Sequence, residues 1–291
     1  MSVSEIISFV RVFSRTLRKD PSSLAGFAIV VFFVLAAIFG PIVLPFDNTY
    51  YPGRRYQPPS LEHPLGMDFV GRDLLRELIA GSRDVLLVAS ITGTVTTIIA
   101  LTIGIASGMI GGLFDTSLMT ITDIFLTIPS FPLLVIIAAG MPRVLNAFEV
   151  GLLFSIVGWA GLARAVRSQV LSTREKPFIE AARSLNLSNV HILFNEILPN
   201  LMSYVVMNLV QAIVNGIYTQ VGLFSLGLLP FTSVNWGIMI NIALGENALI
   251  NNKAWLYLFS PIVCIVLIQT GFILTLHSLE EVFNPRLRSE E

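Results

Sequence analysis

The stretch LAGFAIVVFFVLAAIFGPIVL, residues 24 to 44, contains no charged side chain. As an α-helix it would be about 30 Å long, which is the thickness of the hydrocarbon core of a bilayer. Basic residues precede it, as they do in a signal peptide. However, the run is longer than the roughly 7 to 15 residues of a signal-peptide core, and no small-residue cleavage site follows. We therefore expect a retained membrane-spanning helix.

The composition of the whole chain agrees with this interpretation. Of the 291 residues, 54% are hydrophobic and 13% are charged, and the mean hydropathy is +0.77. An ordinary soluble domain carries about 25% charged residues, so the sequence indicates an integral membrane protein. The net charge of -1 and the scattered basic residues give no reason to expect nucleic acid as a partner. The single cysteine, Cys264, excludes a disulfide framework and a cysteine-type metal site.

Further apolar runs predict an all-α, polytopic membrane protein with about six transmembrane helices. These runs extend from Val85 to about Ile110, from Ile124 to about Gly140 across Pro129 and Pro132, over Val150 to Ala163, from about Leu198 to near Pro230, and from Trp255 to about His277. A short apolar or re-entrant piece is expected around Pro230.

The basic residues predict the orientation of these spans, because loops rich in Lys and Arg stay in the cytoplasm. With the N-terminus inside, the cytoplasmic segments hold 11 of the 18 basic residues, namely Arg11, Arg15, Arg18, Lys19, Arg164, Arg167, Arg174, Lys176, Arg183, Arg286 and Arg288. The loop from Phe46 to Asp84 is then external. Within it, Asp73, Arg76 and Glu77 alternate with leucines and an isoleucine, which predicts either an amphipathic helix flat on the outer membrane surface or a solvated loop helix.

The segment EAARSLNLSNVHILFNEILPN, residues 180 to 200, is polar although its neighbours are apolar. Pro177 suits the first position of a helix, and Asn186 can end that helix in the left-handed conformation. Ser188 can cap a second helix over Asn189 to Ile197, and Pro199 marks the entry into the fifth span. The pattern predicts a helix, a turn and a second helix, which we call the elbow.

The first elbow helix has a surface suited to close contact. Glu180 lies in its first turn, where a negative charge meets the positive end of the helix. Ala181 and Ala182 are strong helix formers with little bulk. The elbow is therefore expected to present a small, smooth knob that another protein can approach closely.

Several motifs together resemble the permeases of ATP-binding-cassette (ABC) importers, specifically the C-type permease of the dipeptide and oligopeptide family. Glu180-Ala181-Ala182, with Asn186 and Ile197-Leu198-Pro199-Asn200 beyond it, looks like the EAA loop of these proteins. The sequence HPLGMDFVGRDLL from His63 to Leu75, the pair Trp236-Gly237, and NPRL from Asn284 to Leu287 are similar to further family signatures. The family usually has glycine where Asn186 stands and an acidic residue where Gln220 stands.

The resemblance implies a type I ABC importer permease fold and a set of partner chains. These are a second homologous permease, two ATPase subunits and an extracytoplasmic substrate-binding protein. It also implies that Glu180, Ala181, Ala182 and Asn186 form the coupling helix that docks on an ATPase, and that the chain lies in a prokaryotic plasma membrane. Members of the family move peptides, oligosaccharides or nickel chelates, so the cargo is open among these classes.

The chain itself is not expected to be an enzyme or to hold a cofactor or metal. A phosphate-binding loop requires G-x-x-x-x-G-K-[ST], and none of Lys19, Lys176 and Lys253 follows a glycine. ATP and Mg²⁺ are therefore expected on the partner ATPase subunits. The rival class is a secondary transporter or channel, but the middles of the predicted spans carry no carboxylate for ion coupling.

A polar stripe marks the fifth span. Asn208, Gln211, Asn215 and Thr219 follow at steps of three, four and four residues, which places them within a sector of about 80° of a helix. They either line the substrate path or hydrogen-bond to a neighbouring helix, where each bond contributes about 0.6 kcal/mol. Gly104 and Gly108 form a G-x-x-x-G pair, which is typical of close helix packing.

These expectations divide the chain as follows. Residues 1–23 form a cytoplasmic segment, 24–44 the first transmembrane helix, and 45–84 the external loop with its amphipathic helix. Residues 85–279 form a core of five spans that includes the cytoplasmic coupling loop 164–197, and 280–291 form a cytoplasmic tail.

Overall fold

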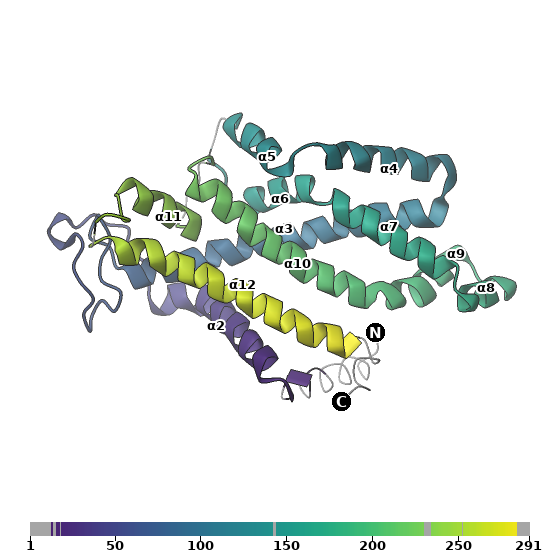
Figure 1. Ribbon diagram of the computed structural model, residues 1–291, viewed down its shortest axis with the longest axis horizontal. Helices are drawn as coiled ribbons and strands as arrows, with labels where there is room; N and C mark the ends of the chain where they lie inside the picture. The colour runs from purple at the N-terminus through teal and green to yellow at the C-terminus, as the bar shows by residue number, and fades with distance from the viewer. Residues whose placement is uncertain are drawn as a thin grey trace.

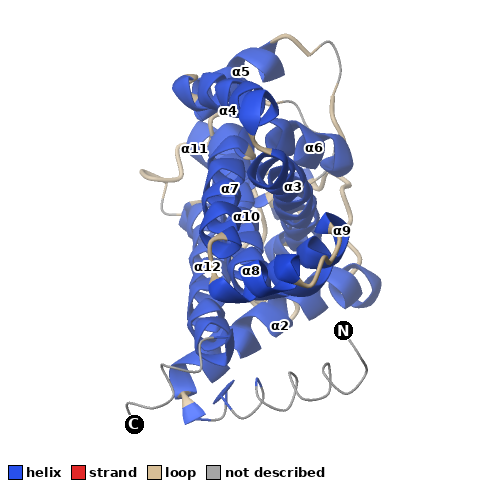
Figure 2. Ribbon diagram, turned by 90° about the vertical axis from the view of Figure 1, so that its right-hand side faces the viewer, coloured by secondary structure: helices blue, strands red, loops and turns tan. Residues whose placement is uncertain are grey.

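The computed structural model describes residues 13, 16–17, 19–141, 144–229, 234–251 and 253–283, and within these ranges it is built of helices and connecting loops (Figures 1 and 2). The predicted features at Arg11, Arg15, Arg18, Pro230 and residues 284–291 lie outside the described residues.

The helices follow one another in this order: α2 (Pro21–Val43), η1 (Pro52–Arg54), α3 (Leu74–Ile110), α4 (Gly112–Thr127), α5 (Ser130–Ala139), α6 (Ala147–Gly158), α7 (Ala160–Arg174), α8 (Pro177–Ser184), α9 (Asn189–His191), η2 (Ile192–Ile197), α10 (Leu198–Ser225), α11 (Trp236–Gly245) and α12 (Trp255–Phe283).

Helix α3 runs through the centre of the bundle, where it packs against α2, α6, α7 and α10 (Figure 1). Helix α12 completes the other side by packing on α2, α10 and α11. The α2–α3 loop lies at one end of the long axis and α8 lies at the opposite end (Figure 1). The two ends that carry the predicted external loop and the elbow are thus separated by the full length of the bundle.

Among the described residues, four helices are long and apolar enough to cross a membrane, and the number rises to six if each of two bent helix pairs also counts as one span. The first helix agrees with the predicted 24–44 span within a few residues, since α2 covers Pro21–Val43. Its N-cap is Asp20, and hydrogen bonds from Ser23 and Ser22 lower the pKa of this carboxyl to about 2. The fold class predicted from the sequence is confirmed.

The third and fourth predicted spans each contain a sharp bend between two helices. Helices α4 and α5 meet at 79°, and α6 and α7 meet at 54°. Pro129 forces the residue before it, Ile128, out of the helical conformation and into an extended one. At the second break, Trp159 alone separates Gly158, the last residue of α6, from Ala160, the first residue of α7.

The prediction of an amphipathic helix within the external loop is wrong. Residues 74–79 are the first turns of α3, which is continuous over 37 residues to Ile110. The hydrophobic residues of this segment do not face a membrane surface, since Leu74 and Leu78 belong to the buried core with Trp236 and Tyr257. The charged side chains are held by partners from other parts of the chain.

Helix α11 is the short apolar piece expected after the fifth span, and Trp236 holds it in place. The indole is fully buried and donates from Nε1 to the carbonyl oxygen of Leu78 at 2.9 Å. Its ring meets that of Phe33 edge to face with centroids 5.6 Å apart. One side chain therefore joins α11 to both α3 and α2.

The close packing predicted from Gly104 and Gly108 is confirmed. A Cβ added at Gly104 would lie 2.6 Å from the carbonyl oxygen of Ala163, and one at Gly108 would lie 2.8 Å from Cγ1 of Val170. Both neighbours belong to α7. The two glycines thus let α3 and α7 touch along their backbones.

Replacing Gly104 by leucine is expected to destabilise the folded protein by about 1–3 kcal/mol, because overpacking forces the two helices apart. Gly161→Ala is the control, since a Cβ there would meet its nearest neighbour, Leu126, at an ordinary 3.9 Å. The midpoint of thermal unfolding in detergent measures both changes. Equal midpoints for the two variants would show that the α3–α7 contact adapts to bulk.

Candidate coupling elbow and polar wall

The elbow has the backbone geometry predicted from its sequence. Helix α8 begins at Pro177, and Asn186 has a φ of 60°, in the left-handed region. The amide of Asn186 donates to Arg183 O at 2.8 Å and that of Leu187 donates to Ala182 O at 3.3 Å, which is the Schellman pattern of a helix C-terminus. The Ser188 hydroxyl then accepts from the amide of His191 at 3.2 Å and caps the second helix.

Asn186→Gly is expected to be nearly silent, because glycine adopts the left-handed conformation freely. Asn186→Val should cost about 1–2 kcal/mol locally, since a β-branched residue is strained there. Hydrogen exchange of the α8 amides would report the difference as faster exchange in the valine variant. Similar exchange in both variants would mean that the turn at Asn186 does not hold the end of α8.

The inner face of α8 corrects one expectation. Ala182 does not lie on an outer surface with Ala181, because its side chain is buried in this chain itself together with Ile179. Both pack into a cluster with Val166, Val170, Ile192, Ile197 and Leu201, from α7, η2 and α10. Positions 179 and 182 are one turn apart, so an amphipathic helix that buries one also buries the other. Glu180 and Ala181 remain exposed.

The elbow exposes three large apolar side chains, which sequence reasoning missed. Leu185 is 75% exposed, Val190 66% and Phe194 59%. Leu185 follows α8, Val190 lies in α9 and Phe194 in η2, and α8 is at the end of the molecule opposite the α2–α3 loop (Figure 1). Exposed apolar patches of this kind mark contacts with another protein. The sequence carried a signal, since large apolar residues recur in a segment otherwise read as polar.

The elbow is tied to the centre of the bundle through α7. Arg174, at the last turn of α7, donates to the carbonyl oxygens of Gly108 and Met109 at the end of α3. A cation is favourable there, because the last carbonyls of a helix carry partial negative charge. Two turns earlier on the same face, Arg167 forms two hydrogen bonds, of 2.6 and 2.5 Å, with Asp115 of α4. A displacement of the elbow is therefore transmitted to α3 and α4.

The polar stripe predicted on the fifth span lies on α10. Asn215 and Thr219 line a cavity of about 310 Å³ together with Thr92, Thr96 and Ser130. Gln211 is exposed and Asn208 is partly exposed. The hydrogen bonds found for the four side chains stay within α10: Asn208 donates to Tyr204 O, Gln211 to Asn215, and Thr219 to Asn215 O. The stripe thus faces open space rather than bonding to a neighbouring helix.

Hydrogen bonding between helices is instead made by Gln220, next to the stripe. Its buried amide donates to the carbonyl oxygen of Val85 in α3 at 2.8 Å and accepts from Nδ2 of Asn235 at 3.2 Å. Asn235 in turn caps α11. An acidic residue here would have to be protonated to donate to Val85, so the amide is suited to this contact.

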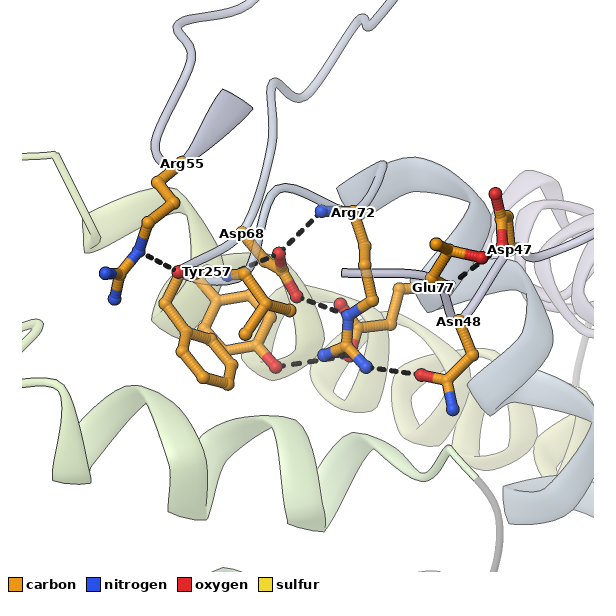
Figure 3. A network of polar contacts seen from close by, with 10 residues as sticks. Asp47, Asn48, Arg55, Asp68, Arg72, Glu77 and Tyr257 are labelled. Atoms are coloured by element: carbon orange, nitrogen blue, oxygen red, sulfur yellow. Dashed lines mark hydrogen bonds and ion pairs between the residues drawn. The ribbon is translucent and has the colours of Figure 1, made fainter. Parts of the chain in front are cut away.

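A charged network joins the α2–α3 loop to the helices at the end opposite the elbow (Figure 3). We call it the loop network: Asp68, Arg72, Glu77 and Tyr257. Nε of Arg72 bonds Asp68 at 2.7 Å and Nη2 bonds Glu77 at 3.2 Å, while the Tyr257 hydroxyl donates to Glu77 at 3.1 Å. Asp68 and Glu77 are 0% and 2% exposed, so one guanidinium is shared between two buried carboxyl groups. Asp68 and Arg72 lie within the His63 to Leu75 motif, Glu77 lies in α3, and Tyr257 lies in α12.

A second contact ties the same loop to the segment before α12. The hydroxyl of Tyr56 donates to Glu246 at 2.9 Å. Burial and this hydrogen bond raise the pKa of Tyr56 to about 12, so the phenol keeps its proton at any physiological pH. The loop is therefore a fixed part of the fold.

Comparison with known proteins gives one answer over the whole chain. The family described as "Binding-protein-dependent transport system inner membrane component" matches residues 100–289, and the "N-terminal TM domain of oligopeptide transport permease C" matches residues 8–59. The oligopeptide transport system permease protein OppC of Bacillus subtilis is 29% identical, with 93% of this chain and 88% of that protein covered. The dipeptide transport system permease protein DppC of Alkalihalophilus pseudofirmus is 31% identical, with 94% and 89% covered.

A solved structure shares the fold. In the inward-facing MetNI methionine ABC transporter, one chain superposes with a TM-score of 0.54 at 18% identity, and 71% of this chain and 97% of that chain are covered. With these matches, the chain belongs to the binding-protein-dependent transport system inner membrane components, as a multi-pass permease subunit of an ABC importer.

Proposed function

We propose that this permease carries peptides delivered by an extracytoplasmic binding protein, and that it forms the path with a second, homologous permease. Relatives named as oligopeptide and dipeptide permeases support this cargo. The open polar surface of Asn208, Gln211, Asn215 and Thr219 supplies neutral hydrogen bonds, which suit the main chain of a peptide of any sequence. Oligosaccharides and nickel chelates are the alternatives within the family.

The energy comes from two partner ATPase subunits that hold ATP and Mg²⁺, and this chain is not itself an enzyme. The observation that carries this proposal is the exposed apolar face of the elbow, with Leu185 at 75%. This surface lies at the end of a segment that charged side chains of α7 anchor to the bundle. An apolar surface in that position suits a groove on another protein. Glu180 and Ala181 lie on the same exposed side of α8, while Ala182 supports the helix from beneath.

Uptake into proteoliposomes tests the proposed function. The chain is reconstituted with its second permease and ATPases, and trialanine is offered with the binding protein. Uptake should require both ATP inside the vesicles and the binding protein outside. Uptake by this chain alone, driven by an ion gradient, would establish a secondary transporter instead.

The proposal places the elbow in the cytoplasm of a prokaryotic cell, with the α2–α3 loop and the segment before α12 outside and both termini inside. In a Cys264→Ser background, Ser184→Cys should react with a membrane-impermeant maleimide only from the cytoplasmic side, and Asn251→Cys only from outside. Each labelling rate should differ by at least about tenfold between right-side-out and inverted vesicles. The opposite preference would reverse the orientation.

A further inference from the structure

Helix α4 carries a second polar stripe, one that the proposed function does not use. Thr116, Thr120, Asp123 and Thr127 follow at steps of four, three and four residues, and all four are exposed. At 100° per residue they occupy a sector of about 60°. The exposed apolar side chains Phe114 and Ile121 lie on a different face of α4.

Helix α7 continues this polar surface. Gly161, Arg164, Ser168 and Ser172 follow at steps of three, four and four residues, and all are exposed. Nη2 of Arg164 bonds Oδ1 of Asp123, which joins the two stripes. The rings of Phe125 and Trp159 meet beside this pair with centroids 5.2 Å apart and fix the two helices against each other.

The Asp123–Arg164 pair lies deep within the helices. Asp123 is 11 residues beyond Gly112, and Arg164 is 10 residues before Arg174, so the pair lies about 15 Å from those helix ends. Helices α4 and α7 each belong to a bent pair that is apolar enough to count as one candidate membrane span. Both side chains are nevertheless about half exposed, at 56% and 52%.

A half-exposed ion pair at this depth cannot face lipid without a large free-energy cost, so it faces water or protein. Its neighbours along both helices are hydroxyls and a glycine, which suit water. Helix α7 contacts both α4 and α10, and Gln211 and Asn215 of α10 are exposed. The stripes of α4 and α7 are thus linked through α7 to the helix that carries the first polar stripe.

The guanidinium of Arg164 has N–H donors that Asp123 does not use. A guanidinium has five N–H donors in a planar fork and pairs well with a carboxylate. Within the described residues, Nη2 serves Asp123 and no bond from Nε or Nη1 is found. By contrast, Arg167 uses both Nε and Nη2 on Asp115. The two arginines of α7 are thus in different situations, one fully engaged with α4 and one partly open.

We propose that Asp123 and Arg164 form a charged subsite of the translocation path, in which Arg164 binds the terminal carboxylate of a passing short peptide. Asp123 orients the guanidinium and offers a partner for the terminal ammonium group of a peptide. This inference rests on the proposed function for its cargo. The hydroxyl groups of Thr120 and Ser168 complete the polar surface around the pair, which we call the wall and which is expected to face water.

Charged thiol-specific reagents test whether the wall is accessible to water, and this test requires no transported peptide. In a Cys264→Ser background of the assembled complex, Thr120→Cys should react with methanethiosulfonates, and severalfold faster with the anionic sulfonatoethyl form than with the cationic trimethylammonioethyl form. Ile121→Cys, on the apolar face of α4, is the control and should stay unreactive. Adding Arg164→Gln should abolish the preference for the anion. An unreactive Thr120→Cys, or a preference that survives without Arg164, would overturn the subsite.

Uptake of two matched peptides tests the cargo chemistry. Trialanine and trialanine amide are each offered at concentrations that saturate the binding protein. Arg164→Gln should lower trialanine uptake about tenfold relative to wild type while changing amide uptake less than twofold. Equal losses for both peptides would show a structural ion pair and overturn the proposal. Failure of the wild-type complex to take up either peptide would instead refute the peptide-importer function. The labelling experiment would still decide whether the surface around Asp123 and Arg164 is accessible to water.

Discussion

Replacing Ala181 by tryptophan is expected to abolish binding-protein-stimulated ATP hydrolysis and uptake while the chain still inserts and assembles. Closure of an ATPase pair can move the spans only through a contact whose free energy differs between the open and closed states. Ala181 lies on the exposed side of α8, where added bulk would keep the helix from seating in a close-packed groove. ATP hydrolysis and trialanine uptake by reconstituted complex measure the loss.

Two neighbouring residues give matched controls for this result. Glu180→Ala should have a mild effect, because an exposed ion pair contributes about 0 to 1 kcal/mol. Ala182→Trp should fail differently, by lowering the yield of folded chain, since Ala182 is 6% exposed and packs within this chain. Wild-type coupling in the Ala181→Trp variant would show that α8 is not the docking helix.

Replacing Arg72 by methionine is expected to prevent accumulation of folded protein. The change leaves the carboxylates of Asp68 and Glu77 buried without their cation. Removal of one partner from a buried ionic network typically costs about 3–5 kcal/mol. The yield and thermal midpoint of detergent-solubilised protein report the effect.

The control for this variant is Arg54→Met, because Arg54 is exposed and stacks over the ring of Tyr51. It should change the stability by about 0.5 kcal/mol or less. Adding Glu77→Gln to Arg72→Met should recover part of the loss, since one of the two stranded charges is then removed. A thermal midpoint for Arg72→Met equal to that of Arg54→Met would show that the loop network does not hold the loop.

Local patterns in the sequence predicted much of this fold. The first span was readable from 21 uncharged residues, and the left-handed turn at Asn186 followed from the conformational preference of asparagine. The glycines at 104 and 108 were readable because close packing requires the absence of a side chain. In each case the cause lies within a few residues of the effect.

What could not be predicted depends on residues far apart in the chain. Glu77 looked like a surface charge, but Arg72 and Tyr257, the latter 180 residues away, bury it. Ala182 looked like part of a docking face, but α7 and η2 cover it. Arg164 was counted with the cytoplasmic basic residues, yet it lies within α7 and pairs with Asp123, 41 residues earlier. None of these partners can be identified from local spacing.

Cross-linking tests the central claim. The claim is that the elbow binds an ATPase subunit and transmits the conformational change of that subunit to the membrane-spanning helices. Leu185→Cys, in a Cys264→Ser background, places a thiol on the outer face of the elbow, and Leu61→Cys, 103% exposed at the opposite end, is the control. With a short bifunctional maleimide, Leu185→Cys should link this chain to an ATPase subunit, with a yield that changes at least twofold when ATP is added. Leu61→Cys should give no such product. A Leu185→Cys thiol that reacts freely with soluble maleimide in the assembled complex, and forms no link to an ATPase with or without ATP, would contradict the account.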